Sequence, residues 1–560
     1  MHRSTTLAVV AGLVLAGVLV AGSQTAGKSS PRDLPPAAQA AMKAIDAERI
    51  RAHVRFLSHD LLEGRGTGAR GGDLAAQYLA TQFALYGLEP AGDNGSYLQK
   101  VPLVGVITVP QDTTYALAPA NSEEMKLTFL NDYVVMDETQ NTASHVDADM
   151  VFVGYGISAP EFNWDDYKGI DLRGKALLML VNEPPSDDGK FFKGPALTYY
   201  GRWTYKFEEA ARRGAVGAVL IHKTEMASYG WDVVRNSWSG ERSYLKVQGP
   251  KLQAASWIQL EVARKALAAA GKNLDELMES AKSRDFRPVP LALKLKAHVV
   301  SKVRPFESSN VIAKLPGSDP KLKDQAVIYT AHYDHLGIRP SAPGDNIFNG
   351  AEDNATGCAV VLELARAYAG AARKPARSIL FATVTAEEQG LLGSEYLGLH
   401  PPVPAGRIVL NLNFDNIAPL GEPEHVQASG SERTTFYSVV EATAKGFGLE
   451  IMPDSNPGAG YFYRSDHFSM ARVGVPAFSV NAGQKFKGRT LEWGDQQSKE
   501  YRAKRYHQPS DEYRPEMDFA SGRDIARFGL ALGWKAATSP QGIEWLPGDE
   551  FETARKASQK

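Results

Sequence analysis

The chain has 560 residues, 43% of them hydrophobic, which is enough apolar material for two or more folded domains. Its 62 basic and 64 acidic residues nearly balance and form no long basic block, so the composition argues against nucleic acid as a partner. Cys358 is the single cysteine, which excludes an internal disulfide. We expect this thiol to be buried, because it begins an apolar helical stretch.

The first 26 residues have the layout of a secretory signal peptide. A short basic start is followed by an apolar stretch over residues 7–21 and then by small and polar residues. An uncleaved membrane anchor is the alternative, but the stretch is short for a bilayer span of ~20 residues. We therefore expect an exported protein, periplasmic or secreted, with no stable membrane association after signal removal.

The next segments differ in character. Residues 27–41 are rich in Ser, Pro and Ala, which predicts a linker. From residue 46 to residue 88, apolar side chains recur at helical spacings. Farther along, three short apolar runs at 151–156, 174–181 and 215–221 predict strands, with a helix at 207–214 before the last. No cluster of metal-binding residues occurs in this middle part, so we expect a separate β-rich unit over 115–300.

Six potential metal-binding or acid–base residues in the C-terminal half follow predicted strands or loops. Apolar strands are predicted over 326–331, 378–385 and 407–414, and a helix from Cys358 onward. Ligands at the ends of separate strands can converge in the crevice of an α/β sheet. The six residues are His332, Asp353, Glu387, Glu388, Asp415 and His507.

This set of residue types suits a two-metal hydrolase. Two histidines and three carboxylates can hold two Zn²⁺ ions if one carboxylate bridges, which leaves the fourth carboxylate free to act as a base. Two ions sharing a water or hydroxide lower its pKa towards ~7 and so provide a nucleophile at neutral pH. A single exposed Asp or Glu is usually only a solvated charge, but six such residues beside apolar segments are hard to explain that way.

The motifs around these residues resemble peptidase family M28. They are Ala331-His-Tyr-Asp-His-Leu-Gly337, Gly350-Ala-Glu-Asp-Asn354, the Glu387-Glu388 pair, Asn413-Phe-Asp415 and Tyr506-His-Gln-Pro509. The resemblance covers residues 305–540 closely and 45–110 more loosely. It implies an αβα sandwich with a mixed central sheet, peptide substrates and two zinc ions per chain.

The resemblance also assigns roles to single residues. It implies that His332, Asp353 and Asp415 hold one zinc while Asp353, Glu388 and His507 hold the other, so that Asp353 bridges. Glu387 would be the general base that accepts the proton of the attacking water. Asp334 lies two positions after His332 on the same face of a strand, and we assign its carboxylate the role of orienting that imidazole.

Other residues near the motifs have less definite roles. In Tyr461-Phe-Tyr-Arg-Ser-Asp-His467, we expect that Tyr461, Tyr463 or Arg464 could contact substrate. His335 and His467 occupy no ligand position, so we expect structural or pocket-lining roles for them. The resemblance also predicts a cis peptide bond between Asp353 and Asn354.

The family resemblance divides the chain into a signal peptide, a linker and an interrupted catalytic domain. Its catalytic parts would be 42–114 and 301–545, and residues 115–300 look like an inserted protease-associated domain bordering the cleft. A spacer without effect on specificity is the alternative for the insert. The charged tail, 546–560, is predicted to be frayed.

The resemblance implies an aminopeptidase that removes N-terminal residues from peptides, and three other functions remain open. A carboxypeptidase of the glutamate carboxypeptidase type would share the ligands and need a cationic anchor, for which Arg464 is a candidate. An acyltransferase of the glutaminyl cyclase type would use one zinc, and a receptor-like protein would have lost its zinc site. The sequence fixes neither the side-chain preference nor the oligomeric state.

Overall fold

The computed structural model describes residues 33–246, 249–339, 344–454 and 456–560. The predicted signal peptide lies outside these residues. Within the described ranges, no helix combines the length and the apolar character needed to cross a bilayer.

The main domain is built on a mixed sheet. Its strands lie in the order β21 (Ala477–Ser479), β18 (Ile408–Asn413), β14 (Ala326–His332), β17 (Ser378–Val384) and β13 (Val289–Leu315). The first four are parallel to one another and β13 is antiparallel to β17. Every residue of β14, β17 and β18 is buried, as expected for apolar strands covered on both faces.

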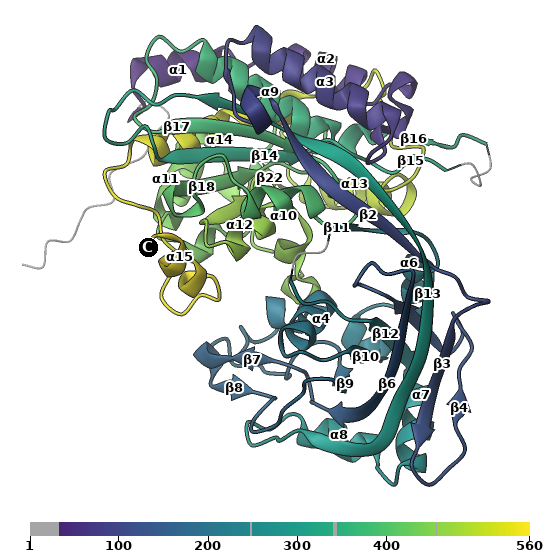
Figure 1. Ribbon diagram of the computed structural model, residues 1–560. Coiled ribbons are helices and arrows are strands. Elements are labelled where there is room, and N and C mark those ends of the chain that lie inside the picture. Colours follow the sequence, from purple (N-terminus) through teal and green to yellow (C-terminus); the bar gives the residue numbers. More distant parts are fainter. Residues whose placement is uncertain (1–32, 247–248, 340–343, 455) are drawn as a thin grey trace, which may run out of the picture.

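Helices cover both faces of this sheet (Figure 1). Alternate β14 residues face opposite cores, with Val327 and Tyr329 on one side and Ile328 on the other. One layer contains α1 (Pro36–Lys43), α2 (Ala47–Leu57), α3 (Arg70–Leu85), α9 (Thr356–Ala369), α11 (Tyr437–Phe447) and α14 (Ala520–Thr538). The other contains α10 (Leu392–Leu399), α12 (His467–Arg472) and α15 (Glu552–Ser558). The predicted αβα sandwich is confirmed.

The predicted linker is partly wrong. Residues 27–32 lie outside the described part of the chain, but α1 begins at Pro36 and packs on α14, with Leu34 and Ala38 buried. Proline suits the first turn of a helix, where its missing N–H has no intrahelical partner. Alanines on one face of this helix allow close packing against α14. A segment rich in Ser, Pro and Ala can therefore form a packed helix and is not always a linker.

The middle of the chain forms a second, mostly β-sheet unit with its own cores. Its central strands are β6 (Ala143–Phe152), β9 (Ala176–Leu180), β10 (Gly217–His222), β12 (Ala254–Gln259) and β5 (Tyr133–Met136), in that order. The predicted strands at 174–181 and 215–221 are confirmed. The one predicted at 151–156 ends at Phe152, because Gly154 and Gly156 adopt positive φ angles that turn the chain.

The remaining elements of the insert are short. Its other strands are β3 (Thr114–Pro119), β4 (Met125–Lys126), β7 (Ser158–Ala159), β8 (Trp164–Asp165) and β11 (Arg242–Leu245), the last pairing with β2 (Leu98–Thr108). Its helices are α4 (Trp203–Arg212), α5 (Thr224–Ala227), α6 (Trp231–Trp238), α7 (Leu260–Ala269) and α8 (Leu274–Ser280). The main domain adds β1 (Glu89–Pro90), β15 (Gly337–Ile338), β16 (Ile347–Phe348), β19 (His425–Gln427), β20 (Glu450–Ile451) and β22 (Asn481–Ala482).

One strand joins the two units. The 27-residue β13 runs from the insert into the main domain, as Figure 1 shows. Its first half pairs with β6 and β3, and its second half pairs with β2 (Leu98–Thr108) and β17. The predicted boundary at residue 300 therefore falls inside a continuous strand.

The predicted frayed tail is wrong, because residues 549–558 pack on the main domain. Arg433 donates to both carboxylate oxygens of Asp549 at 2.8 Å and to Glu550 at 2.7 Å. Glu550 also accepts from the Tyr463 hydroxyl at 2.6 Å and from the Tyr199 backbone N–H of the insert at 3.2 Å. The charged sequence predicted a solvent-exposed tail, but the side chains of Asp549 and Glu550 are buried and paired with Arg433.

We expect Glu550→Ala to lower the melting temperature clearly, because it leaves Arg433 partly unpaired in a buried site. Removing one partner of a buried pair costs about 3 kcal/mol or more. Glu552→Ala is the control, since Glu552 pairs with Lys556 at the surface and should change little. Equal melting temperatures for the two variants would show that the tail does not hold the domains together.

Candidate metal centre

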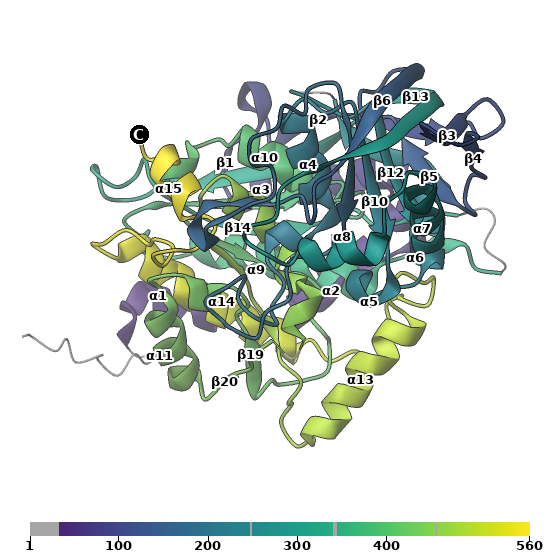
Figure 2. The same ribbon diagram turned by 90° about the horizontal axis from the view of Figure 1, so that it is seen from below.

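The six predicted residues meet at the carboxyl ends of the parallel strands. His332 is the last residue of β14, Glu387 and Glu388 follow β17, and Asp415 follows β18. Asp353 lies on the loop before α9, and His507 comes after α13 (Leu491–Lys504), the long helix at the edge of the molecule in Figure 2. Such a crevice is where open α/β sheets place their ligands.

Asp353 stands between two groups of donor atoms. Its Oδ1 is 3.3 Å from His332 Nε2, which is also 3.3 Å from Asp415 Oδ1. Its Oδ2 is 3.3 Å from His507 Nε2, which is also 3.1 Å from Glu388 Oε2. Each oxygen of Asp353 thus faces a different histidine and a different carboxylate, as a bridging ligand requires.

These separations fit zinc. With bonds of roughly 2.0–2.1 Å to nitrogen and oxygen, two ligands of a tetrahedral Zn²⁺ lie about 3.3 Å apart. The four donor separations around Asp353 are 3.1–3.3 Å. The residues could therefore hold two ions with Asp353 shared between them.

The site concentrates negative charge in a buried place. His332 and Asp353 are almost fully buried. Burial alone would lower the pKa of His332, but Glu387 and Asp415 outweigh it and raise that pKa well above the ordinary value. Buried carboxylates at this density need cations for compensation, which divalent metal ions would provide.

Glu387 is placed to act as a base. Its Oε2 lies 3.9 Å from His332 Nε2, and its carboxylate accepts no hydrogen bond from the residues that the structure describes. Burial, together with the charges of Glu388 and Asp415, raises the pKa of Glu387 well above its ordinary value. A carboxylate of raised basicity beside the donor groups can take a proton from an attacking water.

Asp334 orients the site differently from the prediction. Its Oδ1 is 3.9 Å from His332 Nδ1, beyond hydrogen-bond distance, whereas its backbone carbonyl lies 3.2 Å from that nitrogen. The carboxylate instead accepts from the backbone N–H of Glu387 at 3.1 Å and of Glu388 at 3.4 Å. Asp334 therefore holds the glutamate pair and, through its carbonyl, the imidazole.

Two residues that the sequence did not single out fix the Asp353 loop. Asp511 accepts from the backbone N–H groups of Glu352 and Asp353, both at 3.0 Å. Arg65 is buried and donates to the carbonyls of Gly350 at 2.8 Å and, more weakly, Asp353 at 3.4 Å. Asp511 lies four residues after the predicted ligand His507, and this proximity could have identified it. No sequence feature indicated a role for Arg65.

Two smaller predictions at this loop are confirmed. The Asp353–Asn354 peptide bond is cis. Cys358 is a free, fully buried thiol.

His335 lies closer to the metal centre than expected. Its Nδ1 is 2.7 Å from Glu388 Oε1 and 3.9 Å from Asp353 Oδ2. Together with these two carboxylates it forms a group that could bind a metal, as does the group His332, Asp353 and Asp415. However, 2.7 Å is shorter than the separation of about 3.3 Å between two ligands of one zinc, and the two atoms are not oriented for a hydrogen bond. The short separation therefore favours His335 as an ion-pair partner of Glu388.

This distinction leads to a test with His335→Gln. We expect two zinc ions per chain to remain, with an affinity at the Glu388 position lowered roughly 10- to 100-fold, as for other residues that contact a metal ligand. Metal analysis after equilibration with buffered zinc measures both. Saturation at one zinc per chain would identify His335 as a ligand.

A cavity of about 520 Å³ opens at the metal centre. Asp415, Ser465 and Tyr506 lie at its metal end, and two of the predicted substrate-contacting residues, Tyr461 and Arg464, line it. His467 also lines it, with both ring nitrogens buried and without hydrogen-bond partners among the described residues.

Tyr463 does not line this cavity. Its side chain is 4% exposed, and its hydroxyl donates to Glu550. The hydroxyl is therefore committed to the tail, and the predicted substrate contact rests on Tyr461 and Arg464.

Comparison with known proteins gives the following similarities. Residues 310–528 match the model of Peptidase family M28. Leupeptin-inactivating enzyme 1 of Streptomyces exfoliatus is 28% identical over 247 residues, which cover 43% of this chain and 51% of that protein. A probable zinc metalloprotease of Pyricularia oryzae is 39% identical over 99 residues, 17% of this chain and 18% of that protein. The chain thus spans about half or less of these relatives.

Among solved structures, an aminopeptidase from Aneurinibacillus sp. strain AM-1 aligns with a TM-score of 0.47 and 20% identity, over 91% of this chain and 98% of that one. A zinc aminopeptidase from Bacillus subtilis aligns with a TM-score of 0.40 and 16% identity, over 89% and 97%.

Proposed function

Because residues 310–528 match the model of Peptidase family M28, we propose that the chain is a dizinc peptidase, and specifically an aminopeptidase that releases N-terminal residues. The observation that carries this proposal is the position of Asp353, whose two oxygens face two separate histidine–carboxylate groups. His332 and Asp415 would complete one zinc site, and Glu388 and His507 the other.

The chain's own residues supply acid–base chemistry and positioning. When bound, the two zinc ions would polarise the scissile carbonyl and lower the pKa of water, so that it can act as a nucleophile at neutral pH. Glu387 accepts the proton of that water and passes it to the leaving amine. Asp334 holds the backbone of Glu387 and Glu388, and Asp511 holds that of Asp353.

Acidic groups near the metal end of the cavity support N-terminal specificity. Glu352 lines the cavity beside Asp415, and burial raises the pKa of Glu352 to about 8. A substrate ammonium group placed there would favour the ionised carboxylate and gain an ion pair. A carboxypeptidase is the second candidate, favoured by Arg464 in the same cavity, which could bind a terminal carboxylate.

A matched pair of peptides tests the proposal. The zinc-supplemented protein is given one short peptide with a free N-terminus and the same peptide N-acetylated. Cleavage of the free peptide alone supports the aminopeptidase. Cleavage of both, or of the acetylated one alone, supports the carboxypeptidase, and cleavage of neither contradicts peptidase activity.

We further propose that residues 1–26 direct export and are removed, which N-terminal sequencing of the exported protein would test.

The insert is proposed to be a protease-associated domain that borders the cavity. Its Leu197 N–H donates to the Pro457 carbonyl at 3.1 Å, just before the segment that carries Tyr461 and Arg464.

A further inference from the structure

Three arginines line the cavity beside the metal centre. Arg464 comes from the short helix Tyr461–Arg464, Arg502 lies on α13, and Arg505 is the residue directly after α13. Arginine stays charged at any physiological pH and presents a planar fork of N–H donors. These three residues, which we call the arginine cluster, therefore give the lining of the cavity a fixed positive charge.

Arg464 and Arg502 are exposed to solvent, and Arg505 is half-buried. Among the described residues, no carboxylate lies within ion-pair distance of any of the three, although Arg304, Arg433 and others in this chain are so paired. The Nε of Arg505 is buried and has no hydrogen-bond acceptor in the described part of the chain. A buried donor of this kind normally has a partner.

Three acidic residues, Glu352, Asp415 and Asp454, line the same cavity. The charge of Arg505 opposes part of the rise in the pKa of Glu352, but no carboxylate of the three lies within ion-pair distance of the arginine cluster.

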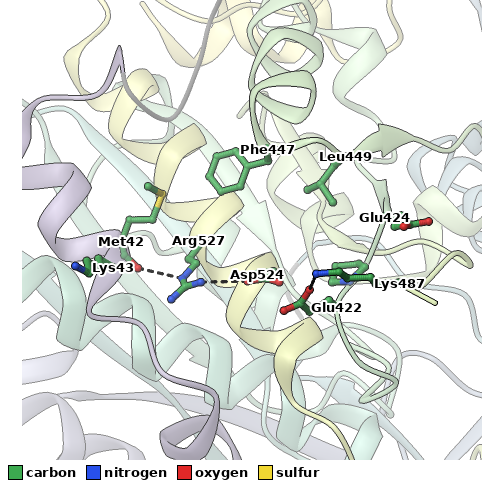
Figure 3. A pocket seen from close by; sticks show the side chains of 10 residues that line it. Met42, Lys43, Glu422, Glu424, Phe447, Leu449, Lys487, Asp524 and Arg527 are labelled. Carbon is green, nitrogen blue, oxygen red and sulfur yellow. Dashed lines mark hydrogen bonds and ion pairs between the residues drawn. The ribbon is translucent and has the colours of Figure 1, made fainter. Parts of the chain in front are cut away.

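A second cavity shows the contrast (Figure 3). It measures about 420 Å³ and is lined by residues of α1, α11, α14 and nearby loops. There Lys487 pairs with Glu422 at 2.9 Å, and Arg527 pairs with Asp524 at 3.4 Å. Two of its three cations thus have carboxylate partners and Lys43 has none, whereas no member of the arginine cluster has one among the described residues.

A fourth arginine, from the insert, adds to the positive charge. The pKa of Arg202 is lowered to about 10 by burial and then by the charge of Arg464. Two guanidinium groups that repel each other in this way gain from an anion that approaches either of them.

We propose that the arginine cluster is a subsite for a carboxylate of the substrate, which makes acidic or very short peptides the preferred substrates. The carboxylate belongs either to an acidic side chain in the first two residues or to the C-terminus of a dipeptide. Arginine binds such groups with paired, charge-assisted hydrogen bonds. This inference rests on the proposed peptidase function.

Three pairs of peptides that differ only by carboxylate or amide test the proposal. They are Glu-Leu-NH₂ with Gln-Leu-NH₂, Leu-Glu-NH₂ with Leu-Gln-NH₂, and Leu-Leu with Leu-Leu-NH₂. In at least one pair, we expect kcat/KM to be on the order of tenfold higher for the carboxylate, the effect of one good charged hydrogen bond. The pair that shows the preference identifies the source of the carboxylate.

Substitutions then connect the preference to the arginines. The ratio within that pair should fall towards one in the triple variant Arg464→Gln, Arg502→Gln, Arg505→Gln. Arg489→Gln is the matched control, because Arg489 lies just before α13, stacks on Trp493 and does not line the cavity. It should keep the ratio.

Binding measurements separate this inference from the proposed activity. Calorimetry with the zinc-loaded Glu387→Gln protein compares the Kd values of the same pairs without turnover. Dissociation constants within twofold in all three pairs, or a preference that survives in the triple variant, would overturn the subsite. If no peptide is hydrolysed by the unsubstituted protein while the binding preference holds, the proposed activity fails and the subsite stands.

Discussion

Glu387→Gln is expected to lower kcat by about 10²–10⁴-fold while two zinc ions per chain remain bound. The amide keeps the shape of the side chain but cannot accept the proton of the attacking water. Metal binding should persist because the donor atoms around Asp353 belong to other residues. Turnover and metal content are measured on the same preparation.

Glu395→Gln provides the control for this result. Glu395 lies on α10, soon after the glutamate pair in the sequence, and faces Arg472 at 3.8 Å rather than the metal centre. We expect its turnover to stay close to that of the unsubstituted protein. Unchanged turnover in Glu387→Gln as well would remove Glu387 from the mechanism.

Asp353→Asn should empty both metal sites, and this is the largest effect that we expect on metal binding. An amide has one oxygen and no charge, so it cannot serve two cations. Zinc content should fall from about two to below one per chain, and activity should fall with it. Because a metal that binds only the folded chain stabilises it, the gain in melting temperature on adding zinc should also disappear.

An exposed aspartate controls for the loss of charge. Asp324 stands just before β14, at the opposite end of that strand from His332, and Asp324→Asn should retain both ions. If Asp353→Asn kept one zinc at full affinity, Asp353 would be a ligand of a single site and not a bridge.

The positions of the metal ligands could be predicted because each depends on the sequence of a neighbouring strand or loop. β14, β17 and β18 are mostly apolar and fully buried, and the polar residues that follow such strands lie at their carboxyl ends. His332 and Asp415 follow directly from this rule. Glu387 and Glu388 do so as well, since they come directly after β17 and its short continuation.

The supporting residues could not be predicted in the same way. Arg65 bonds to backbone carbonyls more than 260 positions away, and carbonyls carry no sequence signal. Asp334 was expected to use its carboxylate on His332, but the approach of the Glu387 backbone gave that carboxylate nearer donors. Long-range packing of this kind decides which of several plausible partners a polar group finds.

The tail and the first helix show the same limit. Asp549 and Glu550 are acidic letters in a charged run, and only the folded chain brings Arg433 and Tyr463 beside them. Likewise, α1 has a composition that suits a linker, and it becomes helical because α14 offers it an apolar face.

The strand β13 has a consequence for the order in which the chain can fold during synthesis. It pairs with β2 so that Thr108 lies opposite Ser301 and Leu98 opposite Val311. Each β2 residue can therefore pair only after a residue roughly 200 positions later has been synthesised. At about 5–20 residues per second, a ribosome needs roughly 10–40 s to make that stretch. During this interval β2 presents Val101, Leu103 and Val106 on an unpaired edge, which is the kind of segment that seeks other chains. We therefore expect the yield in recombinant production to improve when chaperone binding closely follows translation and protects this early strand.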